Sequence, residues 1–524
     1  MAVTNAAQSA VKTVADPNAA YESLSPLWQK CRAVCSGEQY VKDFDANIDV
    51  LTFKNLLIPF SPSMSQAQYK FYKAEAELPG ITAQFAKMII GGLLRKKPLL
   101  ELPDGMPGEA YEWIINEFGK DDSPLVAFLD AALWEEVQTS RAWIFVDYPV
   151  VENAESYTKE ELLSFKPYPV LRKAEQIVNW RVSENQYGKA ILDRVIVRVF
   201  EESYDENEFH PTFKDTVYVH ELIEGKYQIR KFQRSSNTTI VPVIGGAKQN
   251  VEIANNAIKF DLVDTFSNIM ANGEPISIIP AWPLNGSIEL VEPMLAAIID
   301  KEISLYNKIS RRNHLLYGAA TYTPVIISDM TDEEFDEIVS GGLGTWLRLR
   351  QGDDAKVLET PTAALQDMDR AIASSIEEMA KLGIRMLSPE TEQSGVALEI
   401  RNAAQTAQLG TLNNKVSNIM AQVIVFMLNW RYDLQLRVSE IEFSLSTDFN
   451  PVPLGADWLR LATEWYQQGL LPRSVWLVLL KQNDLVSPDY NDEEAIQEIT
   501  ADKLLIPTDQ NAENANAIGA NNAP

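Results

Sequence analysis

The chain has 524 residues, of which 46% are hydrophobic and 23% are charged. This composition is typical of folded globular proteins and excludes a mostly disordered chain. The length predicts several domains within one architecture. The net charge of −27 excludes the basic surface with which most proteins hold phosphate backbones, so a tight nucleic-acid binder is not expected.

No targeting or membrane segment is predicted. Residues 1–18 lack a basic stretch followed by an apolar run, so we expect no secretory signal and a chain that stays in the cytoplasm where it is made. The longest apolar stretch, 420–430, is about half as long as a spanning helix. Cys31 and Cys35 have no second ligand pair nearby, so we interpret them as core or surface thiols; a metal or redox pair is the alternative.

The first predicted elements are helices. Apolar residues at helical spacing over 66–94 predict two helices, with a break at Pro79-Gly80. Residues 125–138 read as a further amphipathic helix. The apolar run at 142–149, which ends in proline, predicts a strand after that helix.

The clearest β region follows. Between Pro167 and Phe232, stretches such as ILDRVIVRVF, TVYVHEL and KYQIRKF alternate apolar with polar residues and are separated by polar turns. This pattern favours an antiparallel sheet with one solvated face. Together with the flanking helices, it predicts an α+β fold.

Three long helices are predicted in the second half, at 294–317, 362–387 and 396–432, from apolar residues at steps of three and four. A compact insert between the first two reads as strand, short helix and two strands: TPVIIS, DEEFDEIV, TWLRLR and AKVLE. A strand-like EIEFSLSTDF comes after the third helix, and two more helices divide at Gly469-Pro472.

No motif of catalysis is found. The three histidines, His210, His220 and His314, do not have the spacing of metal ligands. The chain contains neither a GxSxG elbow nor a phosphate-binding GxxxxGK[ST] loop, and GGLG at 341–344 is interpreted as a turn. Carboxylates are abundant, but no pair stands out for acid–base or metal chemistry. We therefore expect no enzyme activity, no cofactor and no metal site.

The order of elements resembles that of the portal proteins of tailed bacteriophages, the head-tail connector ring subunits. Several local stretches are similar to one portal subfamily and follow the same order along the chain: Tyr69–Pro98, Ser140–Pro149, Lys173–Val182, YTPVI, Asp353–Pro361 and ETEQSGVALEIRNAAQTAQL. The resemblance covers roughly residues 60–500. The chain departs from the pattern at 233–290, which is longer and less regular, and this leaves the boundary before Pro293 open.

The resemblance implies a portal fold with an α+β wing, a helical stem, a small α/β clip and a helical crown. The implied parts are a flexible N-terminal arm (1–20), a wing (21–292), a first stem helix (293–318), a clip (319–361), a second stem helix (362–387), a tunnel loop (388–394), a long helix with a return to the wing (395–455), a helical crown (456–505) and a flexible tail (506–524).

The resemblance also implies a function without catalysis. Such a chain forms a homo-oligomeric ring, typically a dodecamer, at one vertex of the virion capsid, where the genome is packaged and ejected. The implied partners are the large terminase subunit, a head-completion or tail adaptor protein, major capsid and scaffold proteins, and double-stranded DNA that passes through without sequence recognition. The lumen should be mostly acidic with sparse basic rings, which would let DNA slide; the net charge is also that of an ordinary acidic soluble protein.

Site residues follow from the same resemblance. The tunnel loop would comprise Ser388, Pro389, Glu390, Thr391, Glu392, Gln393 and Ser394. Arg385 and Arg401 beside it would face DNA. Trp346, Arg348 and Arg350 in the clip would be the docking anchors, because Trp and Arg dominate interface hot spots; Trp346 could equally be the core of a small domain, and the loop an ordinary exposed connection. The alternative function is a non-enzymatic capsid-associated adaptor or scaffold, which would share the acidity but would not form an axial channel.

Overall fold

The computed structural model describes residues 13–46, 65–149, 165–184, 188–204, 209–235, 259–267, 269–271, 274–320, 323–327, 331, 352, 354–358, 363–382, 395–432, 434–446, 456–468, 476 and 480. The chain divides into two compact units, Met1–Thr447 and Asp448–Pro524. Within the described ranges, no helix is both long and apolar enough to cross a bilayer.

Helices dominate both ends of the first unit. They are α1 (Ala19–Ser36), α2 (Glu38–Ala46), α3 (Gln66–Ala74), α4 (Ile81–Leu93), α5 (Gly108–Asn116), α6 (Leu125–Thr139), α8 (Ala296–Ala320), α10 (Ala363–Lys381) and α11 (Gly395–Tyr432), with the short 3-10 helices η2 (Ala174–Gln176) and η4 (Val438–Glu440). The second unit contains α12 (Ala456–Gln467).

The strands gather mainly in the middle of the chain. They are β1 (Leu99–Glu101), β2 (Trp143–Asp147), β3 (Tyr168–Arg172), β4 (Ile177–Glu184), β5 (Ala190–Ser203), β6 (Thr212–Ile223), β7 (Lys226–Ser235), β8 (Lys259–Phe266), β9 (Met270–Ala271), β10 (Glu274–Pro275), β11 (Ala281–Pro283), β12 (Thr323–Ile327), β13 (Asp354–Leu358) and β14 (Glu442–Ser444). This mixture of helices with antiparallel sheets is the predicted α+β fold.

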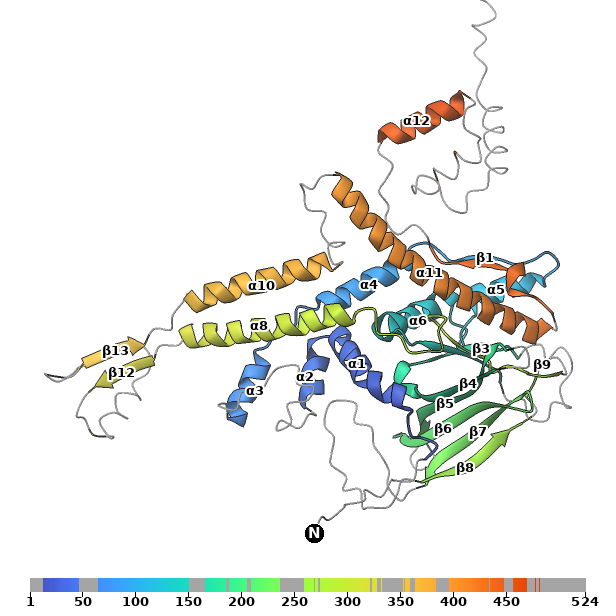
Figure 1. Ribbon diagram of the computed structural model, residues 1–524, viewed down its shortest axis with the longest axis horizontal. Coiled ribbons are helices and arrows are strands. Elements are labelled where there is room, and N and C mark those ends of the chain that lie inside the picture. The colour runs from blue at the N-terminus through green and yellow to red at the C-terminus, as the bar shows by residue number, and fades with distance from the viewer. Residues whose placement is uncertain are drawn as a thin grey trace, which may run out of the picture. The chain divides into compact units, whose positions relative to one another are not determined.

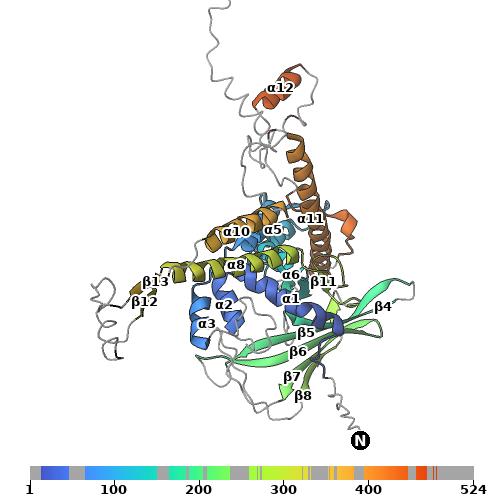
Figure 2. The same cartoon turned by 60° about the vertical axis from the view of Figure 1, so that its left-hand side comes forward.

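The largest sheet has the order β4-β5-β6-β7-β8, and every neighbouring pair is antiparallel (Figure 2). Sequential strands therefore lie side by side, as the alternating pattern of this region predicts. A second sheet has the order β11-β2-β3. Its buried side chains, including Trp143 and Phe145, pack with Val195, Val197 and Val199 of β5 in one apolar cluster.

The other face of the large sheet is covered in part, which limits the expected solvated face to the remainder of that side. Val178, Ile196, Val217 and Val219 form a second buried cluster with Ala15. The covering residues come from the N-terminal segment 13–21, far away in the chain, so the alternation within the strands could not reveal them.

Residues 13–20 pack against this sheet although the sequence analysis places them in a flexible arm. The backbone N–H of Asn18 donates to the carbonyl of Val178 in β4 at 3.1 Å. The Asn18 side chain in turn accepts a hydrogen bond from the backbone N–H of Tyr21 at 2.8 Å and so caps α1. The cap fixes where α1 begins and ties its first turn to the sheet.

The predicted break within 66–94 is confirmed. Ser65 and Gln68 form a reciprocal capping box at the start of α3. Gly80, directly before α4, has a φ of 71°, which is a left-handed conformation that glycine adopts without a steric penalty. α3 ends at Ala74, so the break runs from there to Gly80, directly before α4.

The three long predicted helices are confirmed as α8, α10 and α11, and the strands TPVIIS and AKVLE as β12 and β13. In both views α8 and α10 run side by side, with β12 and β13 at the end remote from α4, α6 and α11 (Figures 1 and 2). β12 pairs antiparallel with β13, with Thr323 opposite Leu358. The expected helix DEEFDEIV and strand TWLRLR lie outside the described residues. We call α8, α10, β12 and β13 the arm.

Candidate functional site

The predicted site residues lie largely outside the described part of the chain. This holds for the tunnel loop from Ser388 to Ser394, for Arg385, and for the clip anchors Trp346, Arg348 and Arg350. Arg401 lies on α11, but the description does not extend to its side chain. The candidate site therefore consists of the arm and its junction with the rest of the first unit.

Three polar contacts hold α8 and α10 together: Lys301 Nζ to Glu378 at 2.5 Å, Lys308 Nζ to Ser375 Oγ at 2.6 Å and Arg312 Nε to Asp369 at 2.6 Å. The partner's number falls as the α8 number rises, which is the pattern of an antiparallel pair. In each contact α8 supplies the cation. Two of the contacts are exposed ion pairs, which contribute at most about 1 kcal/mol each in water.

The arm leaves apolar side chains in water. Ile376 of α10 is 46% exposed, and Leu316 and Tyr317 of α8 are 43% and 51% exposed. Met379 on α10 is fully buried, and Tyr317 contacts Phe71 of α3 edge-on, with ring centroids 5.2 Å apart. Within one chain, the arm therefore keeps part of its apolar surface in water.

A buried carboxylate fixes the base of the arm. Glu302 of α8 is 0% exposed. Its two oxygens accept hydrogen bonds from the first backbone N–H groups of α4, those of Ile81 at 2.9 Å and Thr82 at 2.7 Å. These are donors that a helix leaves without partners. Gly80 has no side chain to cap them, so Glu302 does so from another helix.

A buried arginine fixes the segment that leads into α8. Arg141 is 1% exposed, and Nη1 donates to the carbonyls of Ser287 at 3.3 Å and Ile288 at 2.8 Å. Its guanidinium lies 4.9 Å from the ring of Trp143 and 4.5 Å from that of Trp180. Burial lowers the pKa of Arg141 to about 10, so the side chain stays charged at neutral pH and the two rings replace part of its hydration.

The α11 helix is joined to the residues directly after strand β14 by buried amide and hydroxyl groups. Asn413 Nδ2 donates to the carbonyls of Leu445 at 3.3 Å and Ser446 at 2.8 Å. Ser417 Oγ donates to Asn413 Oδ1 at 2.8 Å and accepts from the Leu445 N–H at 3.2 Å. The second half of α11 is thereby fixed to the body.

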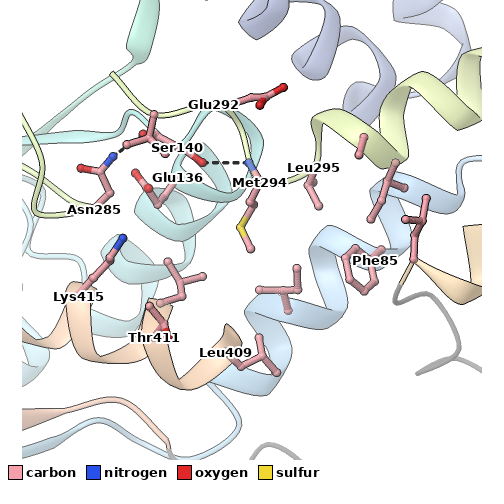
Figure 3. Close-up of a pocket in the computed structure, with 16 residues that line it drawn as sticks. Phe85, Glu136, Ser140, Asn285, Glu292, Met294, Leu295, Leu409, Thr411 and Lys415 are labelled. Carbon is pink, nitrogen blue, oxygen red and sulfur yellow. Dashed lines mark hydrogen bonds between the residues drawn. The ribbon is translucent and has the colours of Figure 1, made fainter. Parts of the chain in front are cut away.

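A pocket of about 480 Å³ lies where α4, α6, the 285–295 segment, α8 and α11 meet. Figure 3 places Glu136, Asn285 and Lys415 at one end of it and Phe85 and Leu409 at the other. Asn285 Nδ2 donates to the carbonyl of Ser140 at 2.7 Å. One end of the pocket is therefore polar and the other apolar.

Glu136 is the unusual group in this pocket. It is 2% exposed, and burial raises the pKa of its carboxyl to about 7. Oε2 accepts the backbone N–H of Ala142 at 3.0 Å. Sequence reasoning missed Glu136, Arg141 and Glu302, because a charged residue among apolar neighbours in the sequence looks the same whether it faces water or the interior.

The three histidines lie in different parts of the structure, apart from the two cysteines of α1. His220 Nδ1 lies 2.6 Å from the hydroxyl of buried Tyr227, and burial lowers the pKa of His220 to about 3. His314 packs against the ring of Tyr72, and His210 is exposed. Cys31 and Cys35 are buried free thiols, and burial raises the pKa of each to about 12. Across the ranges that the structure describes, no group of three metal-binding side chains gathers.

Comparisons with known proteins give two kinds of match. A family model described as a domain of unknown function (DUF4055) matches residues 293–431, which include the arm and most of α11. None of the curated proteins compared with the chain matches it.

Two solved structures are similar over much of the chain. One is from the virion of a native gene transfer agent particle, at 11% identity and a TM-score of 0.34. The other is from the neck of an empty gene transfer agent particle computed with C6 symmetry, at 12% identity and a TM-score of 0.36. Each match covers 76% of this chain and 89% of the other.

Proposed function

We propose that this chain is a portal subunit, one member of a closed ring through which the genome of a tailed bacteriophage is packaged and ejected. The observation that carries the proposal is the arm. Two long helices leave the α+β body together, hold a small β pair at their far end, and lead into a third long helix that returns to the body. This is the element order of the portal resemblance.

The uncovered side chains of the arm support assembly. Ile376, Leu316 and Tyr317 are between 43% and 51% exposed in a single chain, and the α8–α10 contacts are mostly exposed ion pairs. A ring places the arm of each subunit beside two others, which removes this apolar surface from water. A plain helical bundle would not need the β pair at the tip.

The charge fits a channel for DNA. A ring of chains that each carry −27 repels phosphates over most of its surface, so a duplex can pass without being held. The genome enters as cargo rather than as a sequence-specific ligand. We accordingly propose that the protein is non-enzymatic and is part of the virion.

The first test is imaging and mass measurement of the purified full-length chain. Single-particle images should show rings with a central hole, and light scattering should give a mass many times that of one chain. A monomer at micromolar concentration contradicts the proposal. A large assembly without an axial hole favours the adaptor or scaffold alternative instead.

The clip is assigned to docking. We expect Trp346, Arg348 and Arg350 in the insert between α8 and α10 to bind the terminase and later the adaptor. The double variant Arg348→Glu with Arg350→Glu should keep the rings and lose terminase binding. Unchanged binding by intact rings would contradict the docking assignment but not the ring.

The tunnel loop is assigned to the channel wall. The connection from α10 to α11 contains Glu390 and Glu392, which ring symmetry would turn into negative bands, while Arg385 and Arg401 would supply sparse positive charge. Deleting 389–393 should spare ring assembly and impair genome packaging or retention. A mutant phage that packages and holds full-length DNA would rule out this role.

A further inference from the structure

The pocket between α4, α6, α8 and α11 has the properties of a ligand site. Its volume of about 480 Å³ lies within the roughly 300–1,000 Å³ usual for small-molecule sites. Phe85, Ile298, Leu409 and Leu412 are among the side chains that form its apolar part. Val291 and Met294, at the lining, are 42% and 40% exposed, so the apolar part is open to solvent.

Glu136 gives the pocket a polar group in need of a partner. The side chain is 2% exposed, and its Oε2 is bonded to the backbone N–H of Ala142. Within the ranges that the structure describes, no donor is bonded to Oε1. Oε1 is not among the fully buried side-chain atoms that lack a partner, so water can reach it from the pocket, and a ligand that donates a hydrogen bond here would take the place of that water.

Lys415 decides which donor fits. It lines the same end of the pocket as Glu136 and lowers the proton affinity of that carboxyl, yet it forms no ion pair with it. A cationic ligand would be attracted by Glu136 but repelled by Lys415, and the reverse holds for an anionic one, so neither gains a net attraction from the pair. A purely apolar ligand would leave Oε1 without a donor.

We propose that this pocket binds a compact neutral amide with an apolar substituent. The amide N–H would donate to Glu136, its carbonyl would accept from the Lys415 ammonium, and the substituent would lie among Phe85, Ile298 and Leu412. The same group supplies one donor and one acceptor, which matches the two charged side chains. The proposal rests on residues of one chain and does not rest on the proposed ring.

Three related probes test, on the full-length protein at pH 8, whether a neutral ligand binds better than a cationic or an anionic one. At this pH the Glu136 carboxyl is mostly ionised. N-acetyl-leucinamide is neutral, 3-methylbutylamine carries an ammonium at this pH, and N-acetyl-leucine carries a carboxylate; all three end in the same branched apolar group. The neutral amide should bind saturably with a Kd of about 1 mM or tighter, and roughly tenfold more tightly than either charged probe. Equal binding of the three, or no saturable binding of the amide, overturns the proposal.

Two variants locate the binding. Glu136→Gln keeps an acceptor for Ala142 but turns an NH₂ toward the pocket, and it should weaken amide binding roughly tenfold. Asp130→Asn, on the exposed side of the same helix α6, is the matched control and should leave the affinity unchanged. Circular dichroism of both variants establishes that they are folded.

Lys415→Gln keeps the test decisive even if Glu136→Gln does not fold, because Lys415 is exposed and its replacement leaves the interior intact. This variant should bind the amide several-fold more weakly and 3-methylbutylamine more tightly, since the repulsive charge is gone. An unchanged ratio between the two probes would mean that Lys415 does not contact the ligand, and the proposed site would be wrong.

Discussion

Glu302 on α8 holds Thr82 at the start of α4: its carboxylate accepts the Thr82 backbone N–H at 2.7 Å, and neither residue is exposed to solvent. The contact joins residues 220 positions apart in the chain. It therefore connects the helix that forms the arm with a helix of the body, and the stability of one depends on the other.

We expect Glu302→Ala to lower the free energy of unfolding by about 2–4 kcal/mol, because two buried backbone donors lose a charged acceptor. Asp300→Ala, on the same helix but in an exposed pair with Lys30, should cost less than about 1 kcal/mol. Urea unfolding of both variants measures the difference. Equal losses would mean that the cap does not stabilise the junction.

Arg32 joins α1 to two carboxylates, Glu135 of α6 at 2.6 Å and Glu175 of η2 at 2.7 Å. Glu135 is the more buried and also accepts the backbone N–H of Ala174. Removing it leaves a mostly buried guanidinium short of a partner, so Glu135→Ala should destabilise by about 3–5 kcal/mol.

Glu175→Ala is the control for that variant, because the Glu175 side chain is 24% exposed and water can replace it. Its cost should be clearly smaller in the same unfolding experiment. If the order were reversed, the burial of Glu135 would not be what makes the Arg32 contact important.

His220 predicts a loss of stability in acid. Its folded pKa of about 3 is below the ordinary value of about 6.5, so between these values the unfolded chain binds a proton that the folded chain does not. The contribution of neutral His220 to the free energy of unfolding is fully present above pH 6.5 and falls as the pH drops toward 3. At pH 5.5 the loss should be about 1.4 kcal/mol relative to pH 7.5.

The variant His220→Phe isolates this effect, since it retains an aromatic ring beside Phe145 but cannot take up a proton. The pH-dependent change in unfolding free energy should be about 1.4 kcal/mol smaller in the variant than in the native chain. Glu136 changes stability in the opposite direction over the same range, and comparing the two chains removes its contribution. Identical pH profiles would contradict the prediction.

The α8–α10 contacts predict that the stability of the arm depends on the charges of the paired side chains. Lys301→Glu places a second carboxylate opposite Glu378, so amide exchange in α10 should become several-fold faster, as expected for a change of about 0.5–1 kcal/mol. Adding Glu378→Lys reverses both charges and should restore the original rate. If the double variant exchanged as fast as the single one, the pair would not contribute to the register of the helices.

The sequence predicted the elements whose signals are local. The break at Pro79-Gly80, the alternation in β5 and β6, and the apolar steps of α8, α10 and α11 are each contained in one stretch of chain. The sequence did not predict how distant segments cover one another: Ala15 on the sheet and Glu302 on the start of α4 come from far along the chain. The candidate ligand pocket was missed for the same reason, since its lining comes from five separate segments.

The two ends of the insert between α8 and α10 lie together, because the helices are antiparallel and Thr323 pairs with Leu358 directly beyond them. An inserted segment whose two ends lie close together can be exchanged for another without a change in the structure that carries it. The tip of the arm can therefore be replaced or altered in length without displacing α8 and α10 from the body.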